Sequence, residues 1–244
     1  MSHHPAHYAT GVVTSPKDPN DAPAGYPQSG FPQIPGSADI LLIRHGQSEP
    51  YRPGTPFPMV DGHADPALTP NGHEQAQRLA DRLAAAGIDA IYVSTLRRTA
   101  QTAAPLAARL GLAPQVEPEL REVHLGDWEG GEYRQRVAEH DPIVRQVFEQ
   151  ERWDVIPGAE TSASLADRVR AAIDRLAARH AGHRVAIFTH GGVIGQALAL
   201  ASGSRPFAFL SADNASISRL LVIEQRWIVR GFNDTAHLNG HRRP

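Results

Sequence analysis

Two kinds of hydrophobic pattern alternate along the chain. Short unbroken apolar runs, such as Ile40–Ile43 and Val185–Phe188, are typical of strands buried on both faces of a parallel sheet. Between such runs apolar residues recur at helical spacing, as at Leu165, Val169 and Ile173. In chain order the pattern predicts strands at 39–44, 88–94, 114–117, 184–189, 216–224 and 226–231, and helices at 70–86, 96–110, 165–181 and from 193 onward.

Residues with known positional preferences support these boundaries. Thr69 and Pro70 form a favourable helix start, with Thr69 as the N-cap and Pro70 in the first helical position. Gly87 stands where that helix is expected to end, as glycine often does after a last helical turn. The stretch 133–153 is less regular. Its apolar spacing predicts a helix interrupted near Pro142, which we expect to cover a functional site.

The alternation of strands and helices predicts an α/β fold, in which three α/β/α layers surround a mostly parallel sheet. Ligands of such folds bind beyond the carboxyl ends of the strands. His45 directly follows the first strand, and His190 directly follows the strand at 184–189. We therefore expect both imidazoles in one site at one sheet edge. Gly46 is expected to let the main chain pass close to whatever binds there.

Composition narrows the class of protein. Residues 1–37 are rich in Pro, Gly, Ser, Asp and His and are predicted to form a disordered or extended arm, with a single domain at 38–244. The formal net charge is −2, so neither nucleic acid nor a membrane is an expected partner. The chain has no cysteine, which excludes disulfides and thiolate nucleophiles. It shows no signal-peptide core and no apolar stretch of about 20 residues, so the expected location is cytoplasmic.

Positive side chains follow two of the predicted strands. Arg44 precedes His45, and Arg97 begins the helix after the strand at 88–94. Arginine side chains and the free N–H groups of a helix start suit a phosphate or a carboxylate. Nearby cations also lower the pKa of an imidazole, which then stays neutral and can attack phosphorus. Two arginines and two histidines at one edge therefore favour an anion site with a histidine nucleophile.

A phosphate ester that reacts at such a site also needs a proton for its leaving oxygen. Glu122 lies in a loop after the short strand predicted at 114–117 and could act as the general acid. Asp127 and Glu129 lie close by in sequence. Spacing alone does not choose among the three carboxyl groups.

An ordered set of motifs resembles the histidine phosphatase (phosphoglycerate mutase-like) superfamily. The matching segments are Leu42–Ser48, Leu68–Gly72, Ser94–Ala103, Glu122–Gly130, Pro157–Thr161 and Thr189–Gly192. One Arg-His-Gly motif alone would be weak evidence for this family. Because all six segments occur in the family's order, the match is specific. The resemblance implies this family's three-layer fold and a phosphatase that uses neither a metal nor a cofactor.

The resemblance also implies a role for each matched residue. His45 matches the nucleophile that becomes phosphohistidine, and Glu122 matches the proton donor that later activates water. Arg44, Arg97 and His190 match the pocket for the phosphoryl oxygens. Further substrate contacts are expected from Gln47, Ser48, Tyr51 and Gly191.

Three departures from the family pattern surround the mouth of the expected pocket. Gln47-Ser48 replaces the usual Glu-Thr, Tyr51 stands near the position of a phosphate-contacting Asn, and Asp61 stands where many members carry Gln. Because these changes surround the mouth of the pocket, they affect the identity of the substrate more than the basic chemistry. The candidate specificity residues are Tyr51, Arg52, Phe57, His63, Tyr133 and Trp153, and packing in the core is the alternative for the aromatic ones.

The predicted function is hydrolysis of a small phosphorylated substrate, and two alternatives stay open. The first is phosphoglycerate mutase-type transfer, although the segment between Glu122 and His190 is short and mutases tend to carry a longer insertion there. The second is a catalytically idle phosphate-binding domain, which the presence of both histidines, both arginines and Glu122 argues against. The sequence leaves open the physiological substrate and the oligomeric state, a homodimer included.

Overall fold

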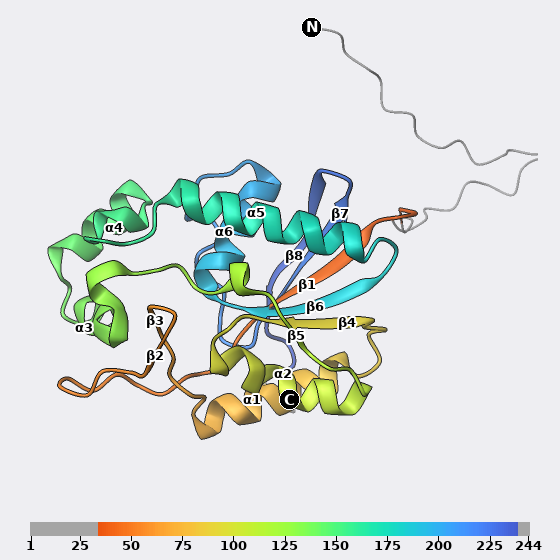
Figure 1. Cartoon of the computed structure of the whole chain (residues 1–244), viewed down its shortest axis with the longest axis horizontal. Coiled ribbons are helices and arrows are strands. Elements are labelled where there is room, and N and C mark those ends of the chain that lie inside the picture. Colours follow the sequence, from red (N-terminus) through yellow and green to blue (C-terminus); the bar gives the residue numbers. More distant parts are fainter. Residues whose placement is uncertain (1–33, 239–244) are drawn as a thin grey trace, which may run out of the picture. The chain divides into compact units, whose positions relative to one another are not determined.

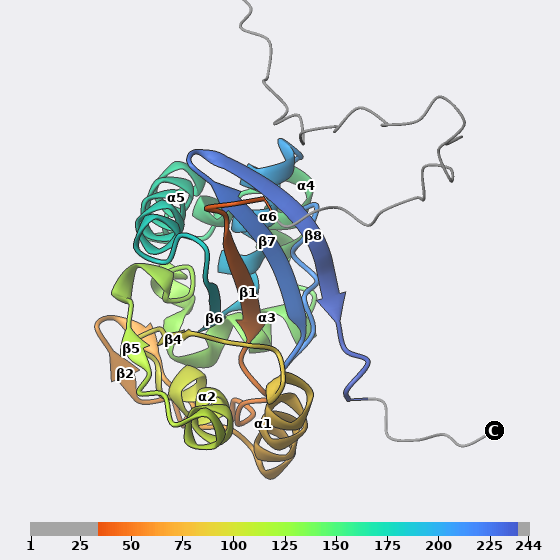
Figure 2. The same ribbon diagram turned by 90° about the vertical axis from the view of Figure 1, so that its right-hand side faces the viewer.

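The computed structural model describes residues 34–238, in which a six-stranded sheet has the order β5-β4-β6-β1-β7-β8 (Figures 1 and 2). β1, β4, β5 and β6 are parallel to one another, whereas β7 pairs antiparallel with β1 and β8 antiparallel with β7. The mostly parallel sheet predicted from the sequence is therefore confirmed. The strands of this sheet are β1 (Ala38–Arg44), β4 (Ala90–Val93), β5 (Gln115–Val116), β6 (Arg184–Thr189), β7 (Ile217–Ile223) and β8 (Arg226–Asp234).

Helices cover both faces of the sheet, as Figure 1 shows. α1 (Pro70–Leu83) and α2 (Arg97–Leu110) lie on one face, and α5 (Ser162–Arg179) and α6 (Gly191–Ser202) lie on the other. This is the three-layer α/β/α arrangement expected from the pattern. No helix within residues 34–238 combines the length and apolar character needed to cross a membrane.

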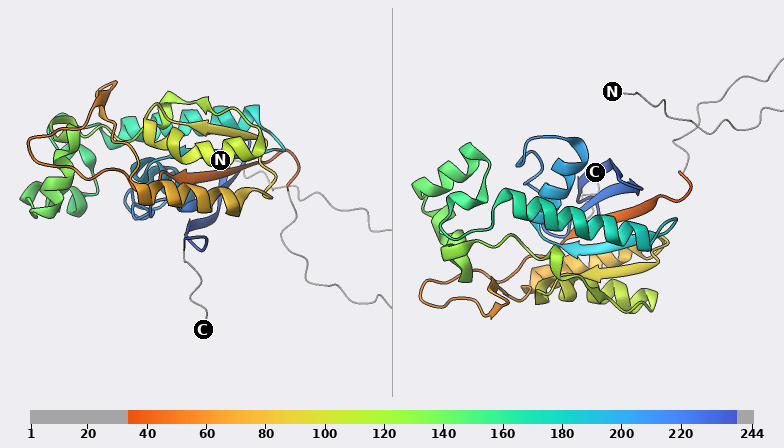
Figure 3. Two further views of the ribbon diagram at one scale, coloured as in Figure 1. Left: turned by 90° about the horizontal axis from the view of Figure 1, so that it is seen from below. Right: turned by 45° about the horizontal axis from the view of Figure 1, so that its top comes forward.

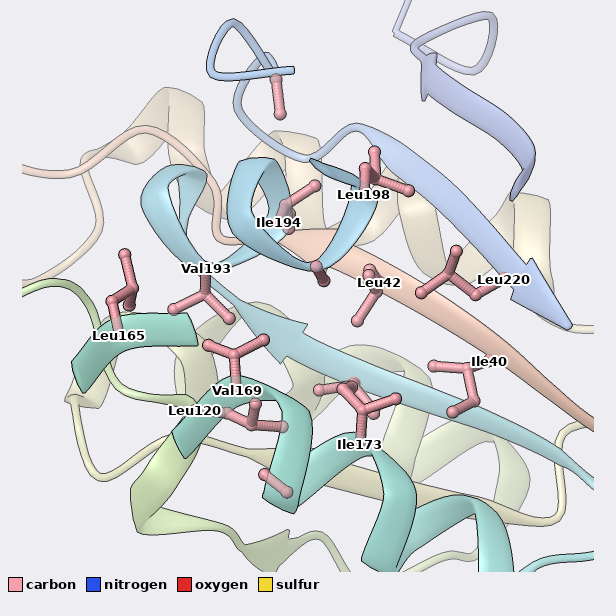
Figure 4. Packing of buried hydrophobic residues seen from close by; sticks show 14 of the residues in the cluster. Ile40, Leu42, Leu120, Leu165, Val169, Ile173, Val193, Ile194, Leu198 and Leu220 are labelled. Carbon is pink, nitrogen blue, oxygen red and sulfur yellow. The ribbon is translucent and has the colours of Figure 1, made fainter. Parts of the chain in front are cut away.

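The apolar run of β1 serves both faces because successive side chains of a strand point in opposite directions. Ile40 and Leu42 pack with Val169 of α5 and Ile194 of α6 (Figure 4). Leu41 and Ile43 belong to the other cluster, with residues of α1 and α2. A strand that is buried on both sides needs apolar residues at every position, which explains the unbroken run.

Short elements gather beyond the carboxyl ends of the parallel strands (Figures 1 and 3). They are the hairpin of β2 (Met59–Val60) and β3 (His63–Ala64), and the helices α3 (Glu132–Ala138) and α4 (Pro142–Gln150). The interruption predicted near Pro142 is confirmed: α4 begins there, with Asp141 as its N-cap. The hairpin lies in the proline-rich stretch between positions 50 and 66, for which the pattern predicted no strand. Within residues 34–238 there are also three 3₁₀ helices, η1 (Pro118–Leu120), η2 (Gly126–Gly131) and η3 (Trp153–Val155).

The ends of the elements follow local chemistry. Thr69 caps α1, and its hydroxyl accepts a hydrogen bond from the N–H of Gly72 at 3.0 Å. α1 ends at Leu83, earlier than the glycine at position 87 had indicated. Of the predicted arm, residues 1–33 lie outside the described range. Ser37, at its end, is only 2% exposed, and its carbonyl accepts from the N–H of Gly182.

Two glycines let the loop after β1 meet the first turn of α1. A Cβ on Gly46 would lie 2.6 Å from the carbonyl oxygen of Gly72, and a Cβ on Gly72 would lie 2.1 Å from that of Gln47. The close approach that Gly46 permits in the structure is to Gly72, and Gly46 does not line the cavity described below. This contact fixes the path of the chain immediately after His45.

Replacement of Gly72 by alanine should destabilise the fold, because the new methyl group meets backbone that cannot move aside cheaply. We expect a loss of about 1–3 kcal/mol in the free energy of unfolding, measured by urea denaturation. Gly231→Ala is the matched control, since its Cβ would meet nothing within 4 Å, and its effect should stay within about 0.5 kcal/mol. Equal stability of the two variants would show that the Gly46–Gly72 contact is dispensable.

Candidate active site

Parallel pairing of β1 with β6 brings the two histidines together. Arg44 is opposite Thr189 in the register of the strands, so the residues that follow, His45 and His190, lie next to each other. Their ring centroids are 5.2 Å apart and their planes are inclined by 60°. The expectation of two imidazoles at one sheet edge therefore agrees with the geometry.

The ring of His45 is held in one tautomer. Its Nδ1 lies 2.7 Å from the carbonyl oxygen of Gly46, and a carbonyl only accepts, so Nδ1 carries the proton. In the neutral ring the lone pair is then on Nε2. Burial lowers the pKa of His45 well below 6.5, and the charges of Arg98 and Arg44 lower it further. The side chain is thus a neutral imidazole with a nucleophilic Nε2 near pH 7.

His190 lies beside His45, is fully buried and is not among the residues that line the cavity. It is the N-cap of α6, and its Nε2 is 2.8 Å from the hydroxyl of Ser94 at the end of β4. Burial, followed by the charges of Arg98 and His45, lowers the pKa of His190 well below 6.5. Its Nδ1 finds no hydrogen-bond partner among residues 34–238.

Arg98, and not Arg97, is the arginine of α2 that reaches the cavity. Arg97 donates from Nε to Asp65 at 2.7 Å, its side chain is 45% exposed, and it does not line the cavity. Arg98 is 6% exposed and donates to the carbonyl of Ala64 at 2.9 Å. Burial lowers its pKa to about 10, so it stays charged at neutral pH. The structure places Arg98 at the cavity, where Arg97 had been expected, so Arg98 replaces Arg97 as the candidate to hold a phosphoryl group.

Helix periodicity explains this difference. Arg98, Thr102 and Leu106 are four residues apart and share the buried face of α2. Thr102 accepts a hydrogen bond from the N–H of Gly46 at 3.0 Å, which ties this face to the loop after β1. Arg97 starts the adjacent face, where the buried carboxylate of Asp65 pairs with its side chain and accepts from its backbone N–H.

Arg44 occupies the position expected for it. It lines the cavity, and one guanidinium nitrogen donates to the carbonyl of Ala212. Its Nε has no partner within the described part of the chain. Gly191 lies against this guanidinium, where a Cβ would be 3.5 Å from Nε. It was expected to contact the substrate, but it is not among the residues that line the cavity. Burial lowers the pKa of Arg44, whereas the charges of Glu122 and Asp213 raise it.

The geometry separates the three candidate carboxyl groups. Glu122 lines the cavity, and its Oε1 accepts from the N–H groups of Val123 at 3.0 Å and of Gly192 at 3.1 Å. Glu129 also lines the cavity, but both of its oxygens accept backbone N–H groups, of Leu125 and Ala64. Asp127 is exposed and lies outside the cavity wall. Glu122 is therefore the lining carboxylate with the less engaged oxygen, since its Oε2 accepts only a long contact of 3.5 Å from the N–H of Gly192.

The cavity has a volume of about 690 Å³ and extends from Arg44 and His45 toward α3. Gln47 lines it, although its side-chain oxygen already accepts from Thr69 and Asn71. Arg52 does not contribute to the wall. The other predicted residues that do are Ser48, Tyr51, Phe57, His63, Tyr133 and Trp153.

Besides Arg98, the lining residues that sequence reasoning missed include Trp128, Arg134 and Asn214. Asn214 donates to the carbonyl of His45 at 3.0 Å from the loop before β7. Nothing in the local sequence marks Asn214, because its position depends on β7 pairing with β1. Trp128 could have been found, because it lies in the segment Glu122–Gly130 that matched the family motif.

A family model of the histidine phosphatase superfamily (branch 1) matches residues 40–235. The chain belongs to the histidine phosphatase superfamily. Phosphoglycerate mutase-like protein 4 of Arabidopsis thaliana is 34% identical over 82% of this chain and 87% of its own length. The metal-independent phosphoserine phosphatase of the same plant is 32% identical over 82% and 83%. Both the family and the fold predicted from the motifs are confirmed.

A solved structure supports the same assignment. The mycobacterial glucosyl-3-phosphoglycerate phosphatase superposes with a TM-score of 0.68 at 27% identity, covering 82% of this chain and 100% of that one. The superfamily thus includes relatives named as phosphatases and relatives named as mutases.

The buried neutral histidines predict a specific pH dependence of stability. Below about pH 6.5 an unfolded chain protonates His45 and His190, whereas the folded protein does not, because both folded pKa values are lowered. The unfolded state then binds more protons, so the free energy of unfolding falls as the pH falls. Between about pH 7 and about pH 5.5 the wild type should lose about 2 kcal/mol more than a His45→Asn/His190→Asn variant, measured by urea denaturation. Identical pH dependence of the two proteins would contradict the neutral assignment.

Proposed function

We propose that this protein is a metal-independent phosphomonoester hydrolase that works through a phosphohistidine intermediate on His45. The observation that carries this proposal is the pair of neutral buried rings beside Arg44 and Arg98. Within the described residues, Arg44 Nε and His190 Nδ1 are buried polar atoms without partners. Buried polar atoms are normally satisfied, so unsatisfied ones that surround a nucleophile indicate a site for an anion.

In the first half-reaction, Nε2 of His45 attacks the phosphorus of the ester and forms a P–N bond. The P–O bond to the alcohol breaks in line with the attack, and Glu122 gives its proton to the leaving oxygen. Arg44 and Arg98 hold the equatorial oxygens, and His190 supports the same group through Nδ1. The helix dipole at the N-terminus of α6 adds to this stabilisation.

In the second half-reaction, water replaces the alcohol and attacks the phosphohistidine. The carboxylate of Glu122 takes a proton from this water as the new P–O bond forms. The P–N bond breaks, and its electron pair returns to Nε2 of His45, so inorganic phosphate leaves and the site is restored. One carboxyl group therefore serves as acid and then as base, as microscopic reversibility requires.

Positioning and charge neutralisation carry most of this catalysis. Enzymes accelerate phosphate-monoester hydrolysis by factors up to about 10²¹, and holding the phosphoryl group in line while its charge is neutralised supplies a large part of such a gain. Fixed charges in a buried site are effective because they need no reorganisation as the transition state forms. Arg44 and Arg98 are both buried, so they meet this condition.

Two features favour hydrolysis over transfer back to the substrate. The helix that lines the cavity from this side, α3, is short, and α4 beside it in the chain is short as well. Two of the compared relatives are named as phosphatases, of phosphoserine and of glucosyl-3-phosphoglycerate. We propose a small phosphorylated metabolite as the substrate here as well.

Turnover and the intermediate should both depend on His45. With p-nitrophenyl phosphate, the wild type should release inorganic phosphate in the presence of EDTA, and an alkaline quench should trap phosphohistidine on the peptide that contains His45. His45→Ala should show neither, with activity reduced by at least about 10⁴-fold, because the nucleophile is lost. Wild-type-like turnover by this variant would exclude the mechanism. Dominant phosphoryl transfer within phosphoglycerate, without release of phosphate, would support the mutase alternative.

A pair of neighbouring arginines tests the phosphoryl pocket. Arg98→Gln should lower kcat by about 10²–10³-fold, as expected when a preorganised donor to the transition state is removed. Arg97→Gln is the matched control, because its side chain pairs with Asp65 outside the cavity, and kcat should change by less than about 3-fold. A larger loss in the Arg97 variant than in the Arg98 variant would reverse the assignment.

A further inference from the structure

Arg134 is a third arginine of the cavity, and the proposed mechanism does not use it. It belongs to α3 and lines the cavity together with Arg44 and Arg98. One of its nitrogens donates to the hydroxyl of Ser48 at 2.9 Å, and another donates to the carbonyl of Glu49 at 2.6 Å. Its guanidinium carbon lies 5.1 Å from the centre of the Phe57 ring. The side chain is thus held at the cavity from two sides, although it is partly open to solvent.

The charge of Arg134 is not neutralised by the protein. No carboxylate among residues 34–238 forms an ion pair with it. Other arginines of α3 and α4 differ in this respect. Arg136 pairs with Glu132 and Asp141, and Arg145 pairs with Glu149. A fixed, unpaired guanidinium that lines a cavity is suited to bind an anion of the ligand.

This charge lies near the proposed phosphoryl pocket but forms a separate point of recognition. Arg134 lowers the pKa of both His45 and Arg98, and Arg44 in turn lowers the pKa of Arg134. Its own anchors, however, are Ser48 and Glu49 in the loop after β1, whereas Arg98 is anchored at Ala64. The cavity that both arginines line also includes five aromatic side chains, Tyr51, Phe57, Trp128, Tyr133 and Trp153.

A cavity lined by aromatic side chains and by three arginines suits a ligand with a short body and two anionic groups. Neither carboxylate of the cavity, Glu122 or Glu129, binds Arg134. Glu122 accepts from the backbone N–H groups of Val123 and Gly192, and Glu129 accepts from those of Leu125 and Ala64. Two of the three arginines are needed for the phosphoryl oxygens in the proposed reaction. The third is left for the alcohol part of the ester.

We propose that Arg134 binds a carboxylate in the alcohol part of the substrate, so that the enzyme prefers phosphomonoesters of hydroxy acids over those of neutral alcohols. The inference rests on the proposed hydrolase function. A guanidinium presents two parallel N–H groups to a carboxylate, and the contacts to Ser48 and Glu49 orient it before the substrate arrives. Ser48, expected to touch the substrate, then acts by positioning Arg134.

A matched pair of esters tests this proposal, because 3-phosphoglycerate and glycerol 3-phosphate differ by a carboxylate in place of a hydroxymethyl group. Arg134→Gln should lower kcat/KM for 3-phosphoglycerate by about 10- to 100-fold and change that for glycerol 3-phosphate by less than about 3-fold. Arg134→Lys should recover part of the preference, since it keeps the charge without the fork. Arg145→Gln, on the exposed side of α4, should leave both values unchanged.

Other outcomes would overturn the proposal. Equal losses for both esters in Arg134→Gln would mean that Arg134 acts on the phosphoryl group or on folding, and no loss for either would mean that it binds nothing. A wild type that hydrolyses neither these esters nor p-nitrophenyl phosphate would contradict the proposed function, and calorimetric binding would then decide about Arg134 separately. His45→Asn should bind 3-phosphoglycerate about 10-fold or more tightly than glycerol 3-phosphate, and His45→Asn/Arg134→Gln should bind the two equally. Equal binding of the two esters by His45→Asn itself would contradict the carboxylate contact.

Discussion

The parallel pairing of β1 with β6 is the constraint on which the rest of the site depends. It aligns Arg44 with Thr189, and the next residue on each strand is a histidine. Two residues that are far apart in the sequence thereby become neighbours, with ring centroids 5.2 Å apart. β4 pairs with β6 in the same direction, so Ser94 at its end reaches His190. The site is assembled by strand register before any loop contributes to it.

Burial and positive charge act on these rings in the same direction. An imidazole that is removed from water and surrounded by guanidinium groups stays neutral, which a nucleophile requires and a cationic ring would prevent. The same burial makes Arg44 and Arg98 stronger partners for an anion, because little water screens them. Burying two cations and two uncharged histidines together lowers the stability of the fold. The apolar layers on both sides of β1 offset this loss.

Much of the fold could be predicted because local patterns decide it. The runs at β1 and β6, the Thr69 cap and the break at Pro142 follow from burial and capping, which act within a few residues. The site was predicted where strand ends define it, at Arg44, His45 and His190. The structure places Arg98 where Arg97 had been expected, although the spacing of Leu106 from Thr102 and Arg98 on α2 held the information.

The remaining parts depend on contacts between distant segments. Asn214 reaches His45 only because β7 lies beside β1. Arg134 enters the cavity because the loop after β1 supplies Ser48 and Glu49 as its anchors. Gly46 was expected near a ligand and in the structure meets Gly72, since the approach of α1 to this loop is a tertiary feature. Neither propensity nor periodicity encodes such contacts.

The most direct measurement of the central claim is a crystal structure of the protein soaked with orthovanadate, which imitates the five-coordinate phosphorus of the transition state. The account predicts vanadium bonded to Nε2 of His45, with its equatorial oxygens on Arg44, Arg98 and Nδ1 of His190, and an apical oxygen facing Glu122. Vanadate bound away from His45, or bound there while Arg44 and Arg98 point elsewhere, would contradict it.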